Sequence, residues 1–255
     1  MISYGTGLSG FLGSQLAKKL DITPISHDKI QSTKLKPFDY FFFLSSYGNL
    51  ASQTDEDLIY KANIEDLISI LKQVKHFKFK SFVFISTSSV MLRTQTTYSR
   101  TKRAAEEILL AFMEKNDLPI CIIQPFSVTG VGEQPEHLIP TLLRAAKSGE
   151  TVNFVPNAVH DWIDVEDVVE GILSLSSHSA RGIFQLGNGI ETTNQQVLDL
   201  VEEVTGKKVK VNLVDSMRSY DTDYWLSTNF KSRGWGWLPK KTLKQSIQEQ
   251  WEAMK

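Results

Sequence analysis

A tyrosine and a lysine four residues apart, Tyr98 and Lys102 in the stretch YSRTK, carry the clearest chemical signal in the sequence. On a helix, residues at this spacing lie on one face, so both side chains can reach one substrate. A tyrosine with a pKa near ~10 is a poor base at neutral pH, but a nearby ammonium favours the phenolate and lowers that value. The pair therefore suits acid–base chemistry.

Thr87 adds a hydroxyl to this pair. It lies eleven residues before Tyr98, where the apolar strand pattern SFVFIST ends, and we expect it to hydrogen-bond the same substrate oxygen as Tyr98. Each residue also has an ordinary interpretation: Tyr98 and Lys102 as a surface pair, and Thr87 as a strand-end hydroxyl bonded to local backbone. The three together, in this chain order, favour a catalytic site.

Three glycines at a spacing of three, Gly7, Gly10 and Gly13, lie between a strand pattern that ends at Thr6 and a helix pattern that begins at Phe11. In a dinucleotide-binding turn the first glycine permits the tight turn, the second lets the backbone approach a pyrophosphate, and the third lets the helix pack on the strand. The helix N-terminus offers free N–H groups to the anion. The alternative is a purely structural turn.

Asp28 strengthens the dinucleotide interpretation, because it follows the glycines by about 20 residues, where an acid can accept a hydrogen bond from a ribose hydroxyl. A solvated turn aspartate is the alternative. His27 and Lys29 beside it could instead meet a 2′-phosphate. We therefore expect NAD as the cofactor, with NADP left open.

The elements that would position these residues alternate between short apolar runs and helical patterns. We expect strands at 1–6, 22–26, 40–46, 81–87, 120–126, 152–156 and 182–188, and helices at 11–20, 58–74, 99–114, 194–205 and 242–254. This alternation predicts an α/β fold, a Rossmann-type doubly wound parallel sheet with a small C-terminal lobe; the family resemblance described below implies that this lobe binds the substrate. Only ten residues separate Asp28 from Asp39, too few for a full crossover, so one βα unit should be shortened.

The pattern loosens after Pro125, which gives the expected domain division. Residues 1–125 would form the NAD(P)-binding Rossmann domain, with 161–187 returning to it. Residues 126–160 and 188–255 would form the small substrate-binding lobe.

The composition of the chain limits the classes of partner that we expect. The chain has 255 residues, 41% hydrophobic and 22% charged, with a formal net charge of −1, so no basic surface for nucleic acid is expected. A single cysteine, Cys121, lies in an apolar run; we expect no disulfide, no metal site and a cytoplasmic location. No apolar run approaches the ~20 residues that span a bilayer. A small-molecule substrate is the expected partner.

The motifs TGLSGFLGS, YKANIEDLISILK, FVFISTSSV, YSRTKRAAEEILL, PICIIQPFSVTG, HDWIDVEDVVEGI and FQLGNG together resemble the extended short-chain dehydrogenase/reductase superfamily, in particular its NAD-dependent sugar-nucleotide epimerases and dehydratases. The likeness covers nearly the whole chain, and GWGWLP resembles the family's terminal signature.

The resemblance implies a role for each matching residue. The catalytic residues would be Thr87, Tyr98 and Lys102. The cofactor would be held by Gly7, Gly10, Phe11, Leu12, Gly13, Asp28, Leu44, Ser45, Ser46, Asn63, Tyr98, Lys102 and Pro125. A nucleoside diphosphate sugar would contact Thr87, Ser88, Ser127, His160, Arg218 and Asp221.

Several positions depart from the family's pattern. Gln124 stands where an Arg is usual, Ser127 replaces a substrate-contacting Asn, and His160 replaces an Arg that grips the diphosphate. Ser88 and Ser89 stand where the 4,6-dehydratases carry an Asp and a Glu, so a dehydratase is not expected.

The expected activity is NAD-dependent epimerisation of a nucleotide sugar through a transient keto intermediate. A reductase or dehydrogenase of a keto-sugar or other carbonyl, dependent on NAD(P)H, is the first alternative, and a non-catalytic dinucleotide-binding regulator is the second. The apolar stripes of the helices at 58–74 and 99–114, usual for core helices, also match the family's dimer helices, so we expect a homodimer.

Overall fold

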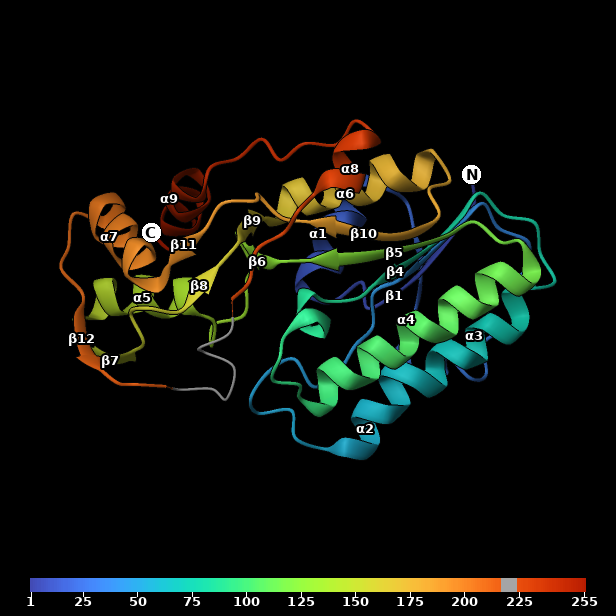
Figure 1. Ribbon diagram of the computed structural model, residues 1–255, viewed down its shortest axis with the longest axis horizontal. Coiled ribbons are helices and arrows are strands. Elements are labelled where there is room, and N and C mark those ends of the chain that lie inside the picture. Colours follow the sequence, from blue (N-terminus) through green and yellow to red (C-terminus); the bar gives the residue numbers. More distant parts are fainter. Residues whose placement is uncertain (217–223) are drawn as a thin grey trace.

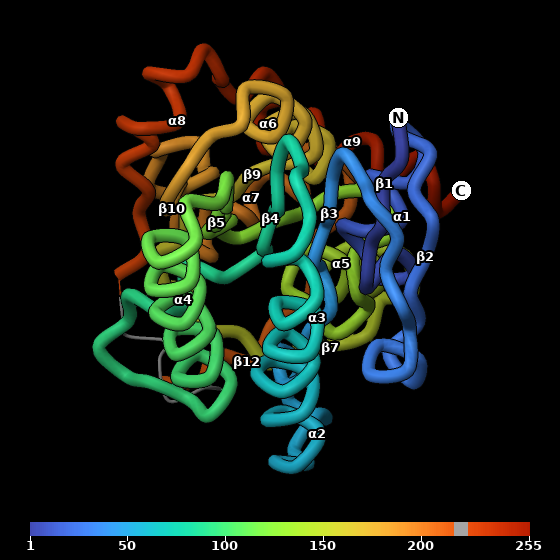
Figure 2. Tube along the Cα trace, turned by 90° about the vertical axis from the view of Figure 1, so that its right-hand side faces the viewer, coloured from blue at the N-terminus to red at the C-terminus, as the bar shows by residue number. Residues whose placement is uncertain are grey.

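A six-stranded parallel sheet forms the centre of the computed structural model, which describes residues 1–216 and 224–255. The strands lie in the order β10-β5-β4-β3-β1-β2, as Figure 2 shows. Their bounds are β1 Ser3–Thr6, β2 Thr23–Ile25, β3 Tyr40–Phe43, β4 Ser81–Ile85, β5 Ile120–Pro125 and β10 Gly182–Leu186. Because every pair is parallel, the carboxyl ends of these strands share one edge of the sheet.

Helices cover both faces of the sheet, which makes it a Rossmann-type fold as predicted (Figure 1). One face packs against α3 (Asp66–Val74) and α4 (Thr97–Asn116), and the other against α1 (Phe11–Lys19) and α6 (Val165–Ser177). Since side chains alternate along a strand, Phe41 and Phe43 point to the α3/α4 face and Phe42 to the α1/α6 face. This double burial explains why β3 is a continuous apolar run.

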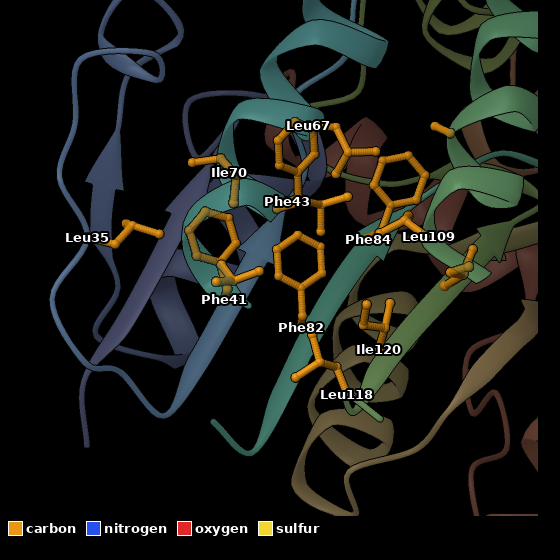
Figure 3. Packing of buried hydrophobic residues seen from close by; sticks show 14 of the residues in the cluster. Leu35, Phe41, Phe43, Leu67, Ile70, Phe82, Phe84, Leu109, Leu118 and Ile120 are labelled. Atoms are coloured by element: carbon orange, nitrogen blue, oxygen red, sulfur yellow. The ribbon is translucent and has the colours of Figure 1, made fainter. Parts of the chain in front are cut away.

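Phenylalanines of neighbouring strands stack on the α3/α4 face (Figure 3). The rings of Phe41 and Phe82 are 5.1 Å apart at an interplanar angle of 10°, and those of Phe43 and Phe84 are 5.8 Å apart. Such offset pairs add stabilisation beyond the area that they bury. They fix the register of β3 on β4, and with it the relative position of the two strand ends.

The shortened βα unit is confirmed. Between β2 and β3 the chain forms only a 3₁₀ turn, His27–Lys29, followed by an irregular segment. One strand therefore lies beyond β1 on that side of the sheet.

The second half of the chain builds a lobe beside the sheet, at the left of Figure 1. Its apolar core joins residues of the three helices α5, α7 and α9 with Phe154 and Trp162. The bounds are α5 Leu138–Ser148, β7 Thr151–Phe154, β8 Val159–His160, β11 Thr192–Thr193, α7 Asn194–Thr205, β12 Lys210–Leu213 and α9 Leu243–Ala253. Two short strands, β6 (Ser127–Thr129) and β9 (Trp162–Asp164), form a parallel pair. Along the chain, β6 connects β5 of the sheet to the lobe, and β9 connects the lobe to α6.

Residues 230–237, which lie in the range expected for the lobe, pack on the sheet. Helix α8 (Phe230–Gly234) contacts β10. Trp237 is buried with the α1/α6 core and donates its indole N–H to the carbonyl of Asp167 at 3.0 Å. The segment after the lobe strands thus returns to the Rossmann core.

The helix expected over residues 58–74 is interrupted. It comprises α2 (Glu56–Tyr60), a π-helical turn Lys61–Glu65 and α3. Asn63, at the centre of the π turn, is fully buried. Such turns frequently mark functional sites.

The apolar stripes of these helices form core. Leu67, Ile70 and Leu71 of α3 and Leu109 of α4 are buried against the sheet, whereas Ile108 and Phe112 of α4 pack against that core but are only partly buried. The homodimer stays a prediction. Within the described residues, no helix is long and apolar enough to cross a membrane.

Replacing Leu67 by Ala should lower the free energy of unfolding by about 2 to 5 kcal/mol, because it leaves a cavity in a core that is closed to solvent. Leu58→Ala, at a position 43% exposed, should change it by less than about 0.5 kcal/mol. Urea unfolding at a low and a high protein concentration checks both. A Leu67→Ala effect that varied with concentration would place Leu67 in an interface instead.

Candidate active site

The candidate site lies at the edge of the sheet where the parallel strands end. Gly7 follows β1, the segment 44–46 follows β3, Thr87 follows β4, and Pro125 ends β5. In open α/β sheets, ligands bind outside this edge, at the point where the strand order reverses. That point lies between β1 and β3.

The glycine turn is shaped by close backbone contacts. Gly7 has φ +69°, and a Cβ there would lie 2.7 Å from the backbone of Leu44 and Ser45. A Cβ at Gly13 would lie 2.1 Å from the carbonyl oxygen of Gly7. Neither position has room for a side chain, so this turn can form only with glycine at both.

The start of α1 is suited to an anion. Gly10 is its N-cap, with no side-chain cap, and no acidic residue lies in the first turn. A Cβ at Gly10 would meet only the Gly7 carbonyl, at 3.3 Å, so its outer side is free for a ligand. The N–H groups of Phe11, Leu12 and Gly13 begin the helix, where backbone dipoles favour a phosphate. These residues fit the pyrophosphate of a dinucleotide.

The turn after β3 is held from two directions. The Ser45 N–H donates to the Thr6 hydroxyl at 3.2 Å. The Asn63 side chain accepts from the Tyr47 N–H at 3.2 Å and donates to its carbonyl at 3.0 Å and to the Thr101 hydroxyl at 3.0 Å. Asn63 therefore ties the turn to α4, which carries Tyr98 and Lys102, and it would serve a cofactor by shaping this turn.

Tyr98 and Thr87 come together as predicted. The side chains of Ser46 and Thr87 lie close enough to the Tyr98 hydroxyl to act on its pKa. Thr87 also caps a 3₁₀ turn, Ser88–Met91, by accepting from the Ser89 N–H at 3.2 Å. The local backbone bond is therefore present, and a bond from Thr87 to a substrate oxygen stays a prediction. Burial raises the pKa of Tyr98 to about 12, although Ser46 and Thr87 lower it. Without a ligand Tyr98 is a phenol.

Lys102 is buried, with 1% of its surface exposed. Its Nζ donates to the Ile85 carbonyl at 2.5 Å and lies 4.1 Å from the centre of the Phe84 ring. Burial lowers the pKa of Lys102 to about 7, against the attraction of Glu106, which raises it. Its charge at neutral pH is therefore set by small changes in its surroundings.

Asp28 lies in the 3₁₀ turn after β2 and is exposed. Because Ile25 pairs with Thr6, the turns after β1 and β2 begin at the same edge of the sheet. Ser26 lowers the pKa of Asp28, and an exposed carboxylate is ionised at neutral pH even without this shift.

Two of the residues predicted to bind substrate meet at the lobe. The Ser127 hydroxyl and His160 Nδ1 are 3.2 Å apart, and the His160 ring lies 5.5 Å from that of Trp162 and 5.0 Å from that of Trp225. Ser88 is buried beside Thr87. Arg218 and Asp221 lie outside the described residues.

Sequence reasoning missed two buried carboxylates. Asp161, fully buried, accepts hydrogen bonds from the backbone of Asn188, Gly189 and Ser227 and from the Ser227 hydroxyl, which joins the start of β9 to the segments after β10 and before α8. The second is Glu106, whose charge raises the pKa of Lys102. A signal for Glu106 was available, because it follows Lys102 by four residues on one helix face.

The doubly wound sheet, the glycine turn at its switch point and the Tyr–Lys helix beside Thr87 define an extended short-chain dehydrogenase/reductase. A family model described as the NAD dependent epimerase/dehydratase family matches residues 33–187. The chain belongs to that family.

Curated relatives agree with this assignment. UDP-glucose 4-epimerase of Yersinia enterocolitica is 24% identical over an alignment of 260 residues, gaps included. The alignment covers 88% of this chain and 77% of that protein. The low-salt glycan biosynthesis protein Agl12 of Haloferax volcanii is 26% identical over 161 residues, 62% of this chain, and the match spans only 52% of that protein.

Solved structures share the fold. MoeE5 in complex with UDP-glucuronic acid and NAD is 22% identical with a TM-score of 0.89, covering 100% of this chain and 99% of that chain. UDP-glucose 4-epimerase of Thermus thermophilus in complex with NAD is 19% identical with a TM-score of 0.87, covering 99% of this chain and 98% of that chain.

The lowered pKa of Lys102 predicts a pH-dependent stability. From about pH 7, the value in the folded protein, to about pH 10, the unfolded chain holds a proton that the folded protein has released, so unfolding becomes harder as pH rises. The free energy of unfolding of the wild type minus that of Lys102→Met should therefore increase over this range. Lys72→Met, an exposed lysine on α3, is the control and should give a flat difference. A flat difference for Lys102→Met as well would show that its pKa is not lowered.

Proposed function

We propose that this protein is an NAD-dependent epimerase of a nucleoside diphosphate sugar. The observation that carries the proposal is the position of the Tyr98 hydroxyl, where Thr87 and Ser46 act on its pKa, one helical turn from the buried Lys102. The Yersinia enterocolitica relative, a UDP-glucose 4-epimerase, supports the sugar nucleotide as substrate class.

The glycine turn and the N-terminus of α1 would hold the pyrophosphate of NAD, and Lys102 would hold ribose hydroxyls. The ionised Asp28 favours NAD over NADP, because a carboxylate accepts from a ribose hydroxyl and repels a 2′-phosphate. NAD, when bound, supplies a reversible hydride acceptor for a sugar carbon.

Tyr98 is the proposed acid–base residue. It takes the proton of a sugar hydroxyl as that carbon is oxidised and returns it when the ketone is reduced from the other side. Thr87 and Ser46 donate to the phenolate oxygen, and the ammonium of Lys102 favours the same form. Because burial raises the pKa of Tyr98 to about 12 in the free protein, the phenolate depends on these groups.

Cofactor balance tests the reaction type. The protein is incubated with UDP-glucose or UDP-glucuronic acid and a substoichiometric amount of NAD, and sugar products are followed by NMR. An epimerase converts far more sugar than the NAD present. Conversion that stops at the amount of NAD, with equal NADH formed, would indicate a dehydrogenase instead.

Tyr98→Phe should lower the turnover rate by about 10² to 10⁴-fold, the usual effect of losing a general acid–base group. NAD affinity, measured by calorimetry, should stay close to that of the wild type, because only one hydroxyl is removed. Tyr60→Phe, 47% exposed on α2, is the matched control. A Tyr98→Phe protein that kept more than about a tenth of wild-type activity would remove Tyr98 from the mechanism.

His160 is proposed to lie against the diphosphate. Its contact with Ser127 and its ring contacts with Trp162 and Trp225 hold it at the lobe. His160→Arg should tighten binding of UDP more than binding of UMP, since a guanidinium presents a planar fork of donors to phosphates. His160→Gln should weaken UDP binding. Equal UDP affinities for all three proteins by calorimetry would make His160 a residue of the fold only.

A further inference from the structure

Glu106 is a buried carboxylate at the place where three elements of the site meet. It lies on α4, four residues after Lys102, and 5% of its surface is exposed. A single oxygen, Oε1, accepts from the Ser86 hydroxyl and from Gln124 Nε2, the latter at 2.9 Å. One atom of a helix thus binds groups from two strand ends.

Both donors are next to residues of the candidate site. Ser86 directly precedes Thr87 at the end of β4, and Gln124 directly precedes Pro125 at the end of β5. The Ser86 N–H donates to the Ile123 carbonyl at 2.7 Å, which joins the two strand ends to each other. Glu106 therefore fixes α4, with Tyr98 and Lys102, relative to Thr87.

Glu106 also supplies a negative charge that stabilises the ammonium form of Lys102. The direct partners of the Lys102 Nζ, the Ile85 carbonyl and the Phe84 ring, carry no full negative charge. Glu106 is the group whose charge favours the ammonium. Lys102 and Arg103, both on α4, are charged groups that lower the pKa of Glu106, and the neutral Ser86 and Gln124 lower it from the strand ends.

Burial raises the pKa of Glu106, while the hydrogen bonds from Ser86 and Gln124 and the charge of Lys102 lower it. Two donors directed at one oxygen favour the ionised form. Without Gln124 and Ser86 the carboxyl would lose the bonds that oppose its burial.

We propose that Glu106 is a positioning residue, which holds α4 against the ends of β4 and β5 and supplies the counter-charge that favours the ammonium form of Lys102. The proposal rests on the proposed function only in assigning Lys102 to cofactor and acid–base work; the charge relation itself belongs to the free protein.

The test measures the titration of Lys102 by NMR of ¹³C-lysine-labelled protein without cofactor, its signal assigned as the one lost in Lys102→Met. Glu106→Gln keeps an oxygen that accepts from Ser86 and Gln124 but removes the charge. The Lys102 midpoint should move to lower pH, because a nearby opposite charge typically shifts a pKa by about 1 to 3 units. Glu107→Gln, the exposed next residue, has the same change in net charge and should leave the midpoint unchanged.

Ser86→Ala gives a second variant, for the case in which Glu106→Gln does not fold. Loss of the Ser86 hydrogen bond makes Glu106 easier to protonate, so the Lys102 midpoint should move in the same direction by a smaller amount. A midpoint equal to that of the wild type in every folded variant of Glu106 and Ser86 would overturn the proposal.

NAD affinity separates this proposal from the proposed function. In Glu106→Gln, NAD binding should weaken by about tenfold or more at pH 8 and by less at pH 6, where more Lys102 is charged. If the wild type does not bind NAD at all, the proposed function fails, and the Lys102 titration still decides the role of Glu106.

Discussion

The parallel register of four neighbouring strands determines where every element of the candidate site lies. Thr6 pairs with Phe43, Phe43 with Phe84, and Phe84 with Ile122, so the turns that follow these strands leave the sheet at one edge. The phenylalanine stacks on the α3/α4 face hold that register. The chemistry of the site thus depends on packing that takes place inside the sheet.

A second constraint is the burial of the face of α4 that carries Lys102 and Glu106. The helix places Lys102 and Glu106 on one face, against Phe84 and the ends of β4 and β5. In water both groups would be fully ionised and would interact weakly. Burial brings the pKa of Lys102 to about 7, which makes the charge of the site responsive to what binds there. Such perturbed groups cluster at functional sites.

The sequence was sufficient to predict the sheet, whereas the roles of the candidate site residues stay predictions. Glycine spacing, the apolar run of β3 and the short segment before Asp39 each reflect a local steric or burial requirement, so they are visible without tertiary information. The π turn around Asn63 was not visible, because it depends on hydrogen bonds to Tyr47 and Thr101, distant in sequence. The same holds for Asp161 and for the hydrogen-bond partners of Glu106, which come from other elements, although the spacing of Glu106 from Lys102 could be seen in the sequence. Arg218 and Asp221 stay predictions of the resemblance.

The shortened unit between β2 and β3 leaves β2 as the last strand on its side of the sheet. An outer strand has unpaired backbone groups that can recruit a strand of another molecule. Here that strand has only three residues, and Pro24 at its centre is exposed and has no N–H to donate. The sheet therefore ends in a strand that is poorly able to be extended, and the loss of a βα unit does not open a route to aggregation.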